Sequence, residues 1–324
     1  MTLVHLTTTS EKTESNPFGL NRYHRVLKAA QNSRFTQHQI TDDPAEAELI
    51  LFIGSKTIFH SDVFGSKVYQ QYPAKSLILD YSDQTIPKLP GIYMTIPKRL
   101  HKTPIYQYGF YQRVFDNHIL DNDIPIANCQ YLYSFVGTVS TYSSLRSKIV
   151  NLTHPRACVR DKSSPKTSLE QDYAQLLQNS KFILCPRGSS PSTFRIFEAM
   201  RAGRVPIIIS DEWFPPRNIN WSDFSLRVSE NNISKIPTLL EKLEPEAERM
   251  GKIARQVWEN NFAVDTGFQW IMDTCNFIQS QRKQFQELES RAIWLEAIFY
   301  LPYKRDIVKF AKEKLKDKLG AFKN

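Results

Sequence analysis

The chain has 324 residues, of which 41% are hydrophobic and 23% charged. This composition is typical of soluble globular proteins and excludes disordered and fibrous classes, and the length suits two domains. The net charge of +9 is uneven, because residues 304–324 alone hold eight Lys or Arg and three Asp or Glu. A mildly basic body with a basic tail favours phosphate-bearing small molecules or an anionic surface over nucleic acid as a partner.

The sequence shows no sign of membrane insertion or secretion. No apolar run approaches the roughly 20 residues that span a bilayer, and MTLVHLTTTS lacks the pattern of a signal peptide. We therefore expect a cytoplasmic protein, possible homo-oligomerisation being left open. The basic amphipathic stretch from Tyr303 onward predicts either a helix packed on the body or a peripheral contact with the inner face of a membrane.

Short apolar runs alternate with helical patterns along the first part of the chain. A helix is predicted from about Phe18 to Ala30. Strands are predicted at 3–8, 36–40, 48–54, 76–83 and 91–96. This alternation is typical of a parallel, doubly wound sheet. We assign residues 1–120 to an N-terminal Rossmann-like domain.

The pattern breaks at 121–130, which we interpret as a linker. Its DND (121–123) matches the DxD pattern that many glycosyltransferases use to hold a divalent metal. Three residues match often by chance, and this copy lies in a polar stretch beside a proline. We therefore expect no metal site here.

A second strand and helix alternation follows, over residues 131–280. Strands are predicted at 131–138, 181–188, 204–210 and 224–230, with helices after Gly137, from about Pro245 to Phe262 and from about Gln269 onward. We assign this part to a second Rossmann-like domain and residues 281–324 to C-terminal helices. The predicted fold class is α/β.

One segment, Lys181 to Asp211, combines a buried strand, a loop PRGSSPS, a helix and a second buried strand. Ser192 is a plausible N-cap for a helix beginning near Thr193, and Gly203 a plausible C-terminal cap. Ligands of open α/β sheets bind in such loops, at the carboxyl ends of the strands.

The contents of this loop suit a pyrophosphate. Arg187 and Arg195 supply permanent positive charge in a forked geometry, and the serine and threonine hydroxyls donate hydrogen bonds. Glu198 suits a ribose or sugar diol, because each hydroxyl can donate to one carboxylate oxygen. Two simpler interpretations stand beside this one: the loop is an ordinary connection, or Arg195 and Glu198 merely pair at i and i+3 on a helix surface.

The same residues resemble the exostosin family, glycosyltransferase family 47. The matching residues are SKFILCPRG (180–188), Ser192, Arg195, FEAM (197–200), Gly203, VPIII (205–209), Asp211 and WSDFSLRVSE (221–230). Weaker likeness extends over most of residues 16–280. The stretch from Tyr81 to Pro97 departs from the N-terminal pattern of the family.

The resemblance implies a GT-B fold, in which two Rossmann-like domains face each other across a cleft. It also implies an inverting transfer from a nucleotide-sugar, usually a UDP-sugar, to a saccharide acceptor in polysaccharide biosynthesis, without a required metal. By the same resemblance, Arg187 and Arg195 lie near the diphosphate, Glu198 near the ribose and Asp211 beside the sugar or acceptor. We add Arg146, Gly188, Ser192 and Thr193 to the donor site.

The base that deprotonates the acceptor is less determined by the sequence. The candidates are Asp83, Asp80, Asp211 and His24, and Asp83 is preferred because it follows a strand at the edge where ligands bind. A turn-capping role for Asp83 and a surface role for His24 remain open. Two alternatives to an inverting transferase also stand: a retaining GT-B transferase, and a non-catalytic binder of nucleotides or nucleic acid.

Overall fold

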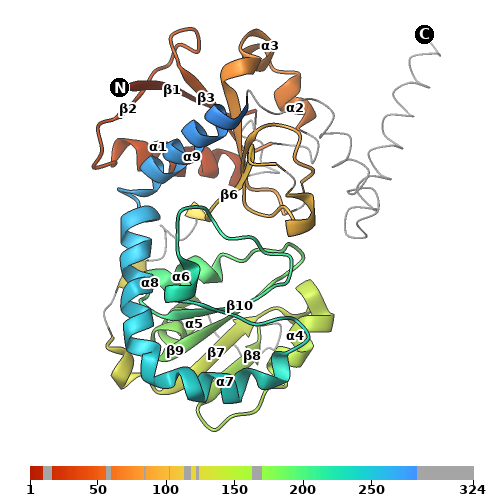
Figure 1. The fold of residues 1–324 in the computed structure, drawn as a ribbon, viewed down its shortest axis with the longest axis vertical. Coiled ribbons are helices and arrows are strands. Elements are labelled where there is room, and N and C mark those ends of the chain that lie inside the picture. Colours follow the sequence, from red (N-terminus) through yellow and green to blue (C-terminus); the bar gives the residue numbers. More distant parts are fainter. Residues whose placement is uncertain are drawn as a thin grey trace, which may run out of the picture.

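The computed structural model describes residues 1–9, 17–55, 60–83, 85–101, 103–112, 118–121, 124–162 and 170–282, and these form two α/β units (Figure 1). Each unit contains one parallel sheet with helices against it. The α/β prediction with two parallel-sheet domains is therefore confirmed. The predicted C-terminal helices lie outside the described residues except for 281–282, which end helix α9.

The sheet of the first unit has the strand order β2-β1-β3-β4-β5-β6, and every pairing is parallel. Its strands are β1 (Thr2–Thr7), β2 (His38–Ile40), β3 (Leu49–Ile53), β4 (Ser76–Asp80), β5 (Gly91–Tyr93) and β6 (Tyr106–Tyr108). The helices of this part are α1 (Pro17–Gln31), α2 (Ser61–Phe64) and α3 (Lys67–Gln71). Strands β3 and β4 are buried along their whole length, as their unbroken apolar runs predict.

The sheet of the second unit has the order β11-β10-β9-β7-β8, again parallel throughout. Its strands are β7 (Tyr131–Gly137), β8 (Ala157–Asp161), β9 (Ser180–Pro186), β10 (Val205–Ile209) and β11 (Leu226–Arg227). Its helices are α4 (Ser143–Val150), α5 (Glu170–Gln178), α6 (Arg195–Arg201), α7 (Ile236–Leu243) and α8 (Ala247–Asn261).

Helix α6 ends in a left-handed glycine, as predicted. Gly203 has φ 64°, its amide donates to the Met200 carbonyl, and the Arg204 amide donates to the Ala199 carbonyl. This is a Schellman cap, which satisfies carbonyls at the helix end. Helix α8 packs closely on the cap, because a Cβ at Gly251 would lie 2.4 Å from the Gly203 carbonyl oxygen.

Helix α9 (Gly267–Arg282) returns the chain to the first unit, where it packs against α1, β5 and β6 (Figure 1). Its last residue, Arg282, donates to the carbonyls of Pro73, Ala74 and Ser76 at distances of 2.8 to 3.1 Å. The second stretch of chain therefore contributes a helix to the first sheet.

The two units share one apolar core on this side. Phe110, which follows β6, is 1% exposed, and its ring lies 4.7 Å from Phe262 and 5.6 Å from Trp270 between ring centroids. It also approaches Phe197 of α6, at 6.2 Å. Among the described residues, no helix is long and apolar enough to cross a membrane.

Candidate functional site

The loop between β9 and α6, residues 187–194, lies at the carboxyl edge of the second sheet. The Arg187 amide donates to the Ile209 carbonyl at the end of β10, and the Ser210 hydroxyl donates to the Pro191 carbonyl at 2.8 Å. These bonds fix both ends of the loop against the neighbouring strand. The predicted donor loop is thus held at the edge where ligands of open α/β sheets bind.

Arg146, on α4, forms the base of the loop. Its guanidinium donates to the carbonyls of Arg187 and Thr138, each at 2.9 Å. Burial, and next the charge of Arg195, lower its pKa to about 10. A Cβ at Gly188 would lie 3.3 Å from the Arg146 Nη2, so only a residue without a side chain sits here without displacing it. Arg146 therefore shapes the loop by binding its carbonyls.

Arg187 is buried as well, with 4% of its surface exposed. Its guanidinium carbon lies 4.7 Å from the ring centroid of Tyr142, within the range of a cation–π contact. Its ion pair with Glu230 is long, 3.9 Å between Nη1 and Oε1. A stacked guanidinium with such a distant counter-charge is well prepared to receive an anionic oxygen.

Arg195 lies deeper, at the carboxyl end of β7. Its Nη2 donates to the Val136 carbonyl at 2.6 Å, and the guanidinium carbon lies 4.9 Å from the Phe135 ring centroid. A Cβ at Gly137 would come within 3.2 Å of Nη2, so this glycine makes room for the arginine. Among the described residues, its buried Nε has no hydrogen-bond partner.

Glu198 lies one turn into α6 and is 8% exposed. Its Oε2 accepts a hydrogen bond of 2.6 Å from the Tyr173 hydroxyl on α5. Burial, and next the charge of Glu198, raise the pKa of Tyr173. The carboxylate that we predicted near a ribose thus already holds a neighbouring tyrosine.

The predicted N-cap at Ser192 is wrong. Helix α6 begins at Arg195 after Phe194, which caps it without a side-chain hydrogen bond. Thr193 Oγ1 accepts from the Arg195 amide at 3.4 Å, while Ser192 lies in the preceding turn, where its carbonyl accepts from the Ser190 hydroxyl. The helix therefore begins later than its Ser and Thr content predicts, and Ser192 instead meets another part of the molecule.

That other part is Tyr111, which sequence reasoning missed. It follows β6 in the first unit, and its hydroxyl hydrogen-bonds with Ser192 and Ser190 of the donor loop. Its ring lies edge-on to Phe194, with centroids 6.5 Å apart. Burial, and next the charge of Asp83, raise the pKa of Tyr111. Tyr111 therefore meets the loop with its hydroxyl and also feels the charge of the candidate base Asp83.

Asp83 follows β4 at the carboxyl edge of the first sheet. Its side chain reaches solvent, yet the surrounding protein raises its pKa, an effect that Arg22 on α1 opposes. A carboxylate with a raised pKa is suited to accept a proton. The charge of Asp83 acts on Tyr111, whose hydroxyl meets the loop of the second sheet.

The other candidate bases lie in less suitable places. Asp80 is 1% exposed and accepts from His60 and Thr85, each at 2.8 Å, so it is enclosed. His24 is exposed on α1. Asp211 accepts from the Ser229 hydroxyl and the Glu230 amide, at 3.2 and 3.4 Å, which makes it a turn-stabilising residue.

Of the DND triplet, only Asp121 is described. The Arg201 guanidinium donates two hydrogen bonds to the Asp121 carboxylate, one from Nε to Oδ1 at 2.8 Å and one from Nη2 to Oδ2. Asn122 and Asp123 lie outside the described residues. Within the described ranges, no group of three His, Cys, Asp or Glu is placed to hold a metal ion.

The comparisons with known proteins agree with the resemblance. Residues 101–243 match the sequence model of the Exostosin GT47 domain. Exostosin-1 of Drosophila melanogaster is 27% identical over 201 residues, which cover 54% of this chain and 26% of that protein. An exostosin-1 homologue of Caenorhabditis elegans is 42% identical over 71 residues, covering 21% of this chain and 19% of that protein.

Residues 101–243, which include β6 of the first unit and most of the second unit, therefore carry the sequence pattern of the exostosin family of glycosyltransferases. The matched region spans about a quarter or less of the length of these two relatives.

Among solved structures, a glycosyltransferase from Rickettsia africae is 11% identical with a TM-score of 0.45, over 83% of this chain and 84% of that one. Anabaena HepE in complex with UDP is also 11% identical, with a TM-score of 0.39, over 85% of this chain and all of that one (100%). The two parallel-sheet units agree with the two-domain α/β fold that the resemblance implies.

Proposed function

We propose that this chain is an inverting glycosyltransferase that moves a sugar from a nucleotide-sugar, a UDP-sugar in our assignment, to a saccharide acceptor in polysaccharide or glycoconjugate synthesis. One observation carries the proposal: Arg146, Arg187 and Arg195 are buried at or beside the β9–α6 loop, where an anion would be held. The proton-accepting group that we assign is Asp83, which follows β4 of the first sheet and whose charge acts on Tyr111.

The arginines support a diphosphate as the ligand. Arg146, Arg187 and Arg195 are all at least 93% buried, since their exposed fractions are 7%, 4% and 5%. Within the described part of the chain, their only ion pair is the long one from Arg187 to Glu230. Buried cations are costly unless an anion pairs with them. A diphosphate would supply that anion.

Asp83 and the arginines then have separate roles in the sugar transfer. As the acceptor oxygen forms its bond to the anomeric carbon, the bond from that carbon to the phosphate oxygen breaks. The acceptor proton passes to Asp83, and the negative charge that develops on the leaving diphosphate is stabilised by Arg187. Arg146 holds the loop that presents Arg187, and Arg195 lies beside it, at the carboxyl end of β7.

Release of UDP from a panel of UDP- and GDP-sugars, with mixed oligosaccharide acceptors, tests the proposal. We expect release with a UDP-sugar, and a fall on the order of 100-fold for Arg187→Lys, because a lysine keeps the charge but loses the fork and the stack on Tyr142. Arg249→Lys is the control, since Arg249 is exposed on α8 and, in the part of the chain that the structure describes, its ion pair is with the nearby Glu246. Equal rates for both variants would refute the donor assignment.

Metal removal is a second test. Because the proposal gives the charge of the leaving group to arginine, we expect dialysis against EDTA to leave the rate of UDP release unchanged within about twofold. A rate that falls on chelation and returns with added Mg²⁺ or Mn²⁺ would contradict this part of the proposal.

The configuration of the product separates the inverting proposal from the retaining alternative. We expect the anomeric coupling constant in the proton NMR spectrum of the product to show the configuration opposite to that of the donor. A product with the configuration of the donor would favour a retaining enzyme on the same fold, and nucleotide binding without any product would favour a non-catalytic binder.

A further inference from the structure

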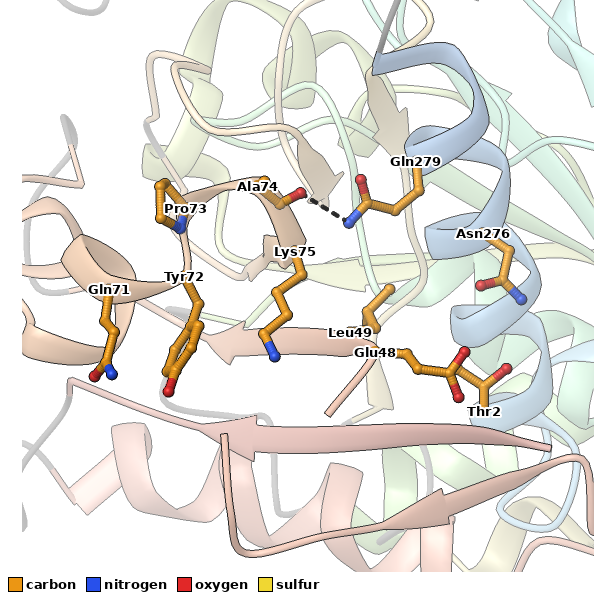
Figure 2. Close-up of a pocket in the computed structure, with 10 residues that line it drawn as sticks. All are labelled: Thr2, Glu48, Leu49, Gln71, Tyr72, Pro73, Ala74, Lys75, Asn276 and Gln279. Atoms are coloured by element: carbon orange, nitrogen blue, oxygen red, sulfur yellow. Dashed lines mark hydrogen bonds between the residues drawn. The ribbon is translucent and has the colours of Figure 1, made fainter. Parts of the chain in front are cut away.

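A pocket of about 510 Å³ lies on the first unit, away from the donor loop (Figure 2). It is formed where β3 and β4 begin, together with the start of β1 and one face of α9. The parallel strands carry Asp83 and Tyr111 at their opposite, carboxyl ends. Strands of five residues are about 16 Å long, so the pocket and the candidate reaction centre lie on opposite edges of the sheet.

The walls of the pocket are fixed by bonds between side chains and backbone. Lys75 Nζ donates to the carbonyls of Ala45 and Ala47, at 2.9 and 2.6 Å, and lies 4.4 Å from the ring centroid of Tyr72. From α9, Gln279 donates to the Ala74 carbonyl at 3.4 Å (Figure 2), and Arg282 donates to the same carbonyl at 2.8 Å. The pocket is therefore formed before any ligand enters, which lowers the cost of binding.

The chemistry of the lining favours an uncharged ligand rich in hydroxyl groups. One acid, Glu48, and one base, Lys75, line the pocket, so it has no excess charge to attract an anion. Lys75 is already engaged by two carbonyls and an aromatic ring. Other polar groups of the lining are the side-chain amides of Gln71, Asn276 and Gln279 and the hydroxyls of Thr2 and Tyr72. Amides and hydroxyls can both donate and accept hydrogen bonds.

An aromatic ring beside planar amides is a combination that suits sugars, because the ring contacts the apolar C–H face while amides bond to the hydroxyls. We propose that this pocket is a non-catalytic saccharide-binding site, separate from the donor site. In this role the pocket would hold part of a glycan acceptor near the enzyme and so raise its effective concentration. That purpose rests on the proposed function, whereas the binding of a saccharide is independent of it.

Isothermal titration with cellohexaose, maltohexaose, xylohexaose and chitohexaose tests the pocket. We expect at least one of these neutral oligosaccharides to bind the full chain, with an affinity about tenfold or more lower for the double variant Gln71→Ala with Asn276→Ala. Both residues are exposed, so the fold should tolerate their truncation. Gln281→Ala is the control, since this amide belongs to the same helix but does not line the pocket.

Addition of UDP separates the two proposals. We expect saturating UDP to leave oligosaccharide affinity unchanged, because the sites lie at opposite edges of the sheet. Absence of binding by all the oligosaccharides, equal binding by the double variant, or displacement by UDP would each overturn the pocket assignment. If UDP fails to bind while the oligosaccharide still does, the donor proposal fails and the pocket stands.

Discussion

At the scale of single residues, Tyr111 is the side chain on which the proposed site depends most. Its hydroxyl meets Ser190 and Ser192, while its ring lies against Phe194 and Phe197. The ring contacts are apolar packing, whereas the hydroxyl sets the position of the loop. The two contributions can therefore be separated by experiment.

Tyr111→Phe removes the hydroxyl and keeps the ring. We expect kcat for sugar transfer to fall by about tenfold, since small misplacements of reacting groups are costly. The dissociation constant of UDP should change less than about threefold, because the arginines that bind it are untouched. Measurement of both constants distinguishes a positioning role from a structural one, which would move them together.

Tyr81→Phe is the matched control for that substitution. Tyr81 is 8% exposed, and its hydroxyl has no hydrogen-bond partner among the described residues. Loss of this hydroxyl should leave kcat within about twofold of the wild-type value. Equal kcat values for the two variants would argue against a positioning role for Tyr111.

The sequence predicts a donor loop at residues 187–194 but gives no sign of Tyr111, and the reason is physical. Arg187, Arg195 and Glu198 stand within one short motif, so their types and spacing are visible in the sequence. Tyr111 follows a three-residue strand about 80 positions away from the loop. Its role exists only because the chain brings the ends of two sheets together.

At the scale of elements, the apolar pattern predicted the interior strands well but missed two of the four edge strands, β6 and β8. Strands β3 and β10 appear almost where their apolar runs lie, because both faces are buried. Strand β8 (Ala157–Asp161) is an edge strand with polar residues, and β6 has only three residues. Such strands leave little periodic signal, and neither was predicted.

Salt bridges at one end of the second sheet connect α7 and the turn after it to the strands. Glu244 accepts from both ends of the Arg156 guanidinium, each at 2.7 Å, and from Lys181 at 2.8 Å. The Arg156 hydrogen bonds are the main cause that lowers the pKa of Glu244 to about 2. The ionised carboxylate is therefore stabilised in the folded protein.

The lowered pKa of Glu244 makes the stability of the folded protein depend on pH. Because the folded pKa of Glu244 is below its unfolded value, its contribution is complete above about pH 4.5 and is lost as the pH falls toward 2. The Glu244 side chain is 21% exposed and its partner Arg156 is 46% exposed, so screening by solvent reduces the contribution to about 1 kcal/mol. We expect Glu244→Gln to lower the free energy of unfolding by this amount at pH 7, and urea titrations should show the difference vanishing near pH 2. A difference that grows on acidification would contradict this.

At the scale of the whole molecule, the two units contact each other in two regions. The first is the shared apolar core around Phe110. The second is the stretch after Asp211, where Arg99 of the first unit donates from Nη2 to Oε1 of Glu212 at 2.6 Å. In the same region Phe214 stacks on Tyr108, with ring centroids 5.0 Å apart. The position of α9 on the first sheet adds to these contacts and could not be predicted from its helical periodicity alone.

We therefore expect both units to unfold in one transition. Phe110→Ala should lower the free energy of unfolding by about 3–5 kcal/mol, because a large ring leaves the shared core. Denaturant titration followed by circular dichroism and by tryptophan fluorescence should give coincident curves for the wild type. Leu239→Ala is the control, since this leucine of α7 is 38% exposed. Two separated transitions in the wild type would show independent units.

The central claim is that a nucleotide diphosphate binds between the β9–α6 loop and the first sheet. A crystal structure of the full chain with UDP tests it most directly. We predict that the diphosphate oxygens lie within hydrogen-bond distance of the Arg187 guanidinium and the Ser192 hydroxyl, on the side that faces Tyr111 and Asp83. UDP bound at any other place, including the pocket of Figure 2, would contradict the account.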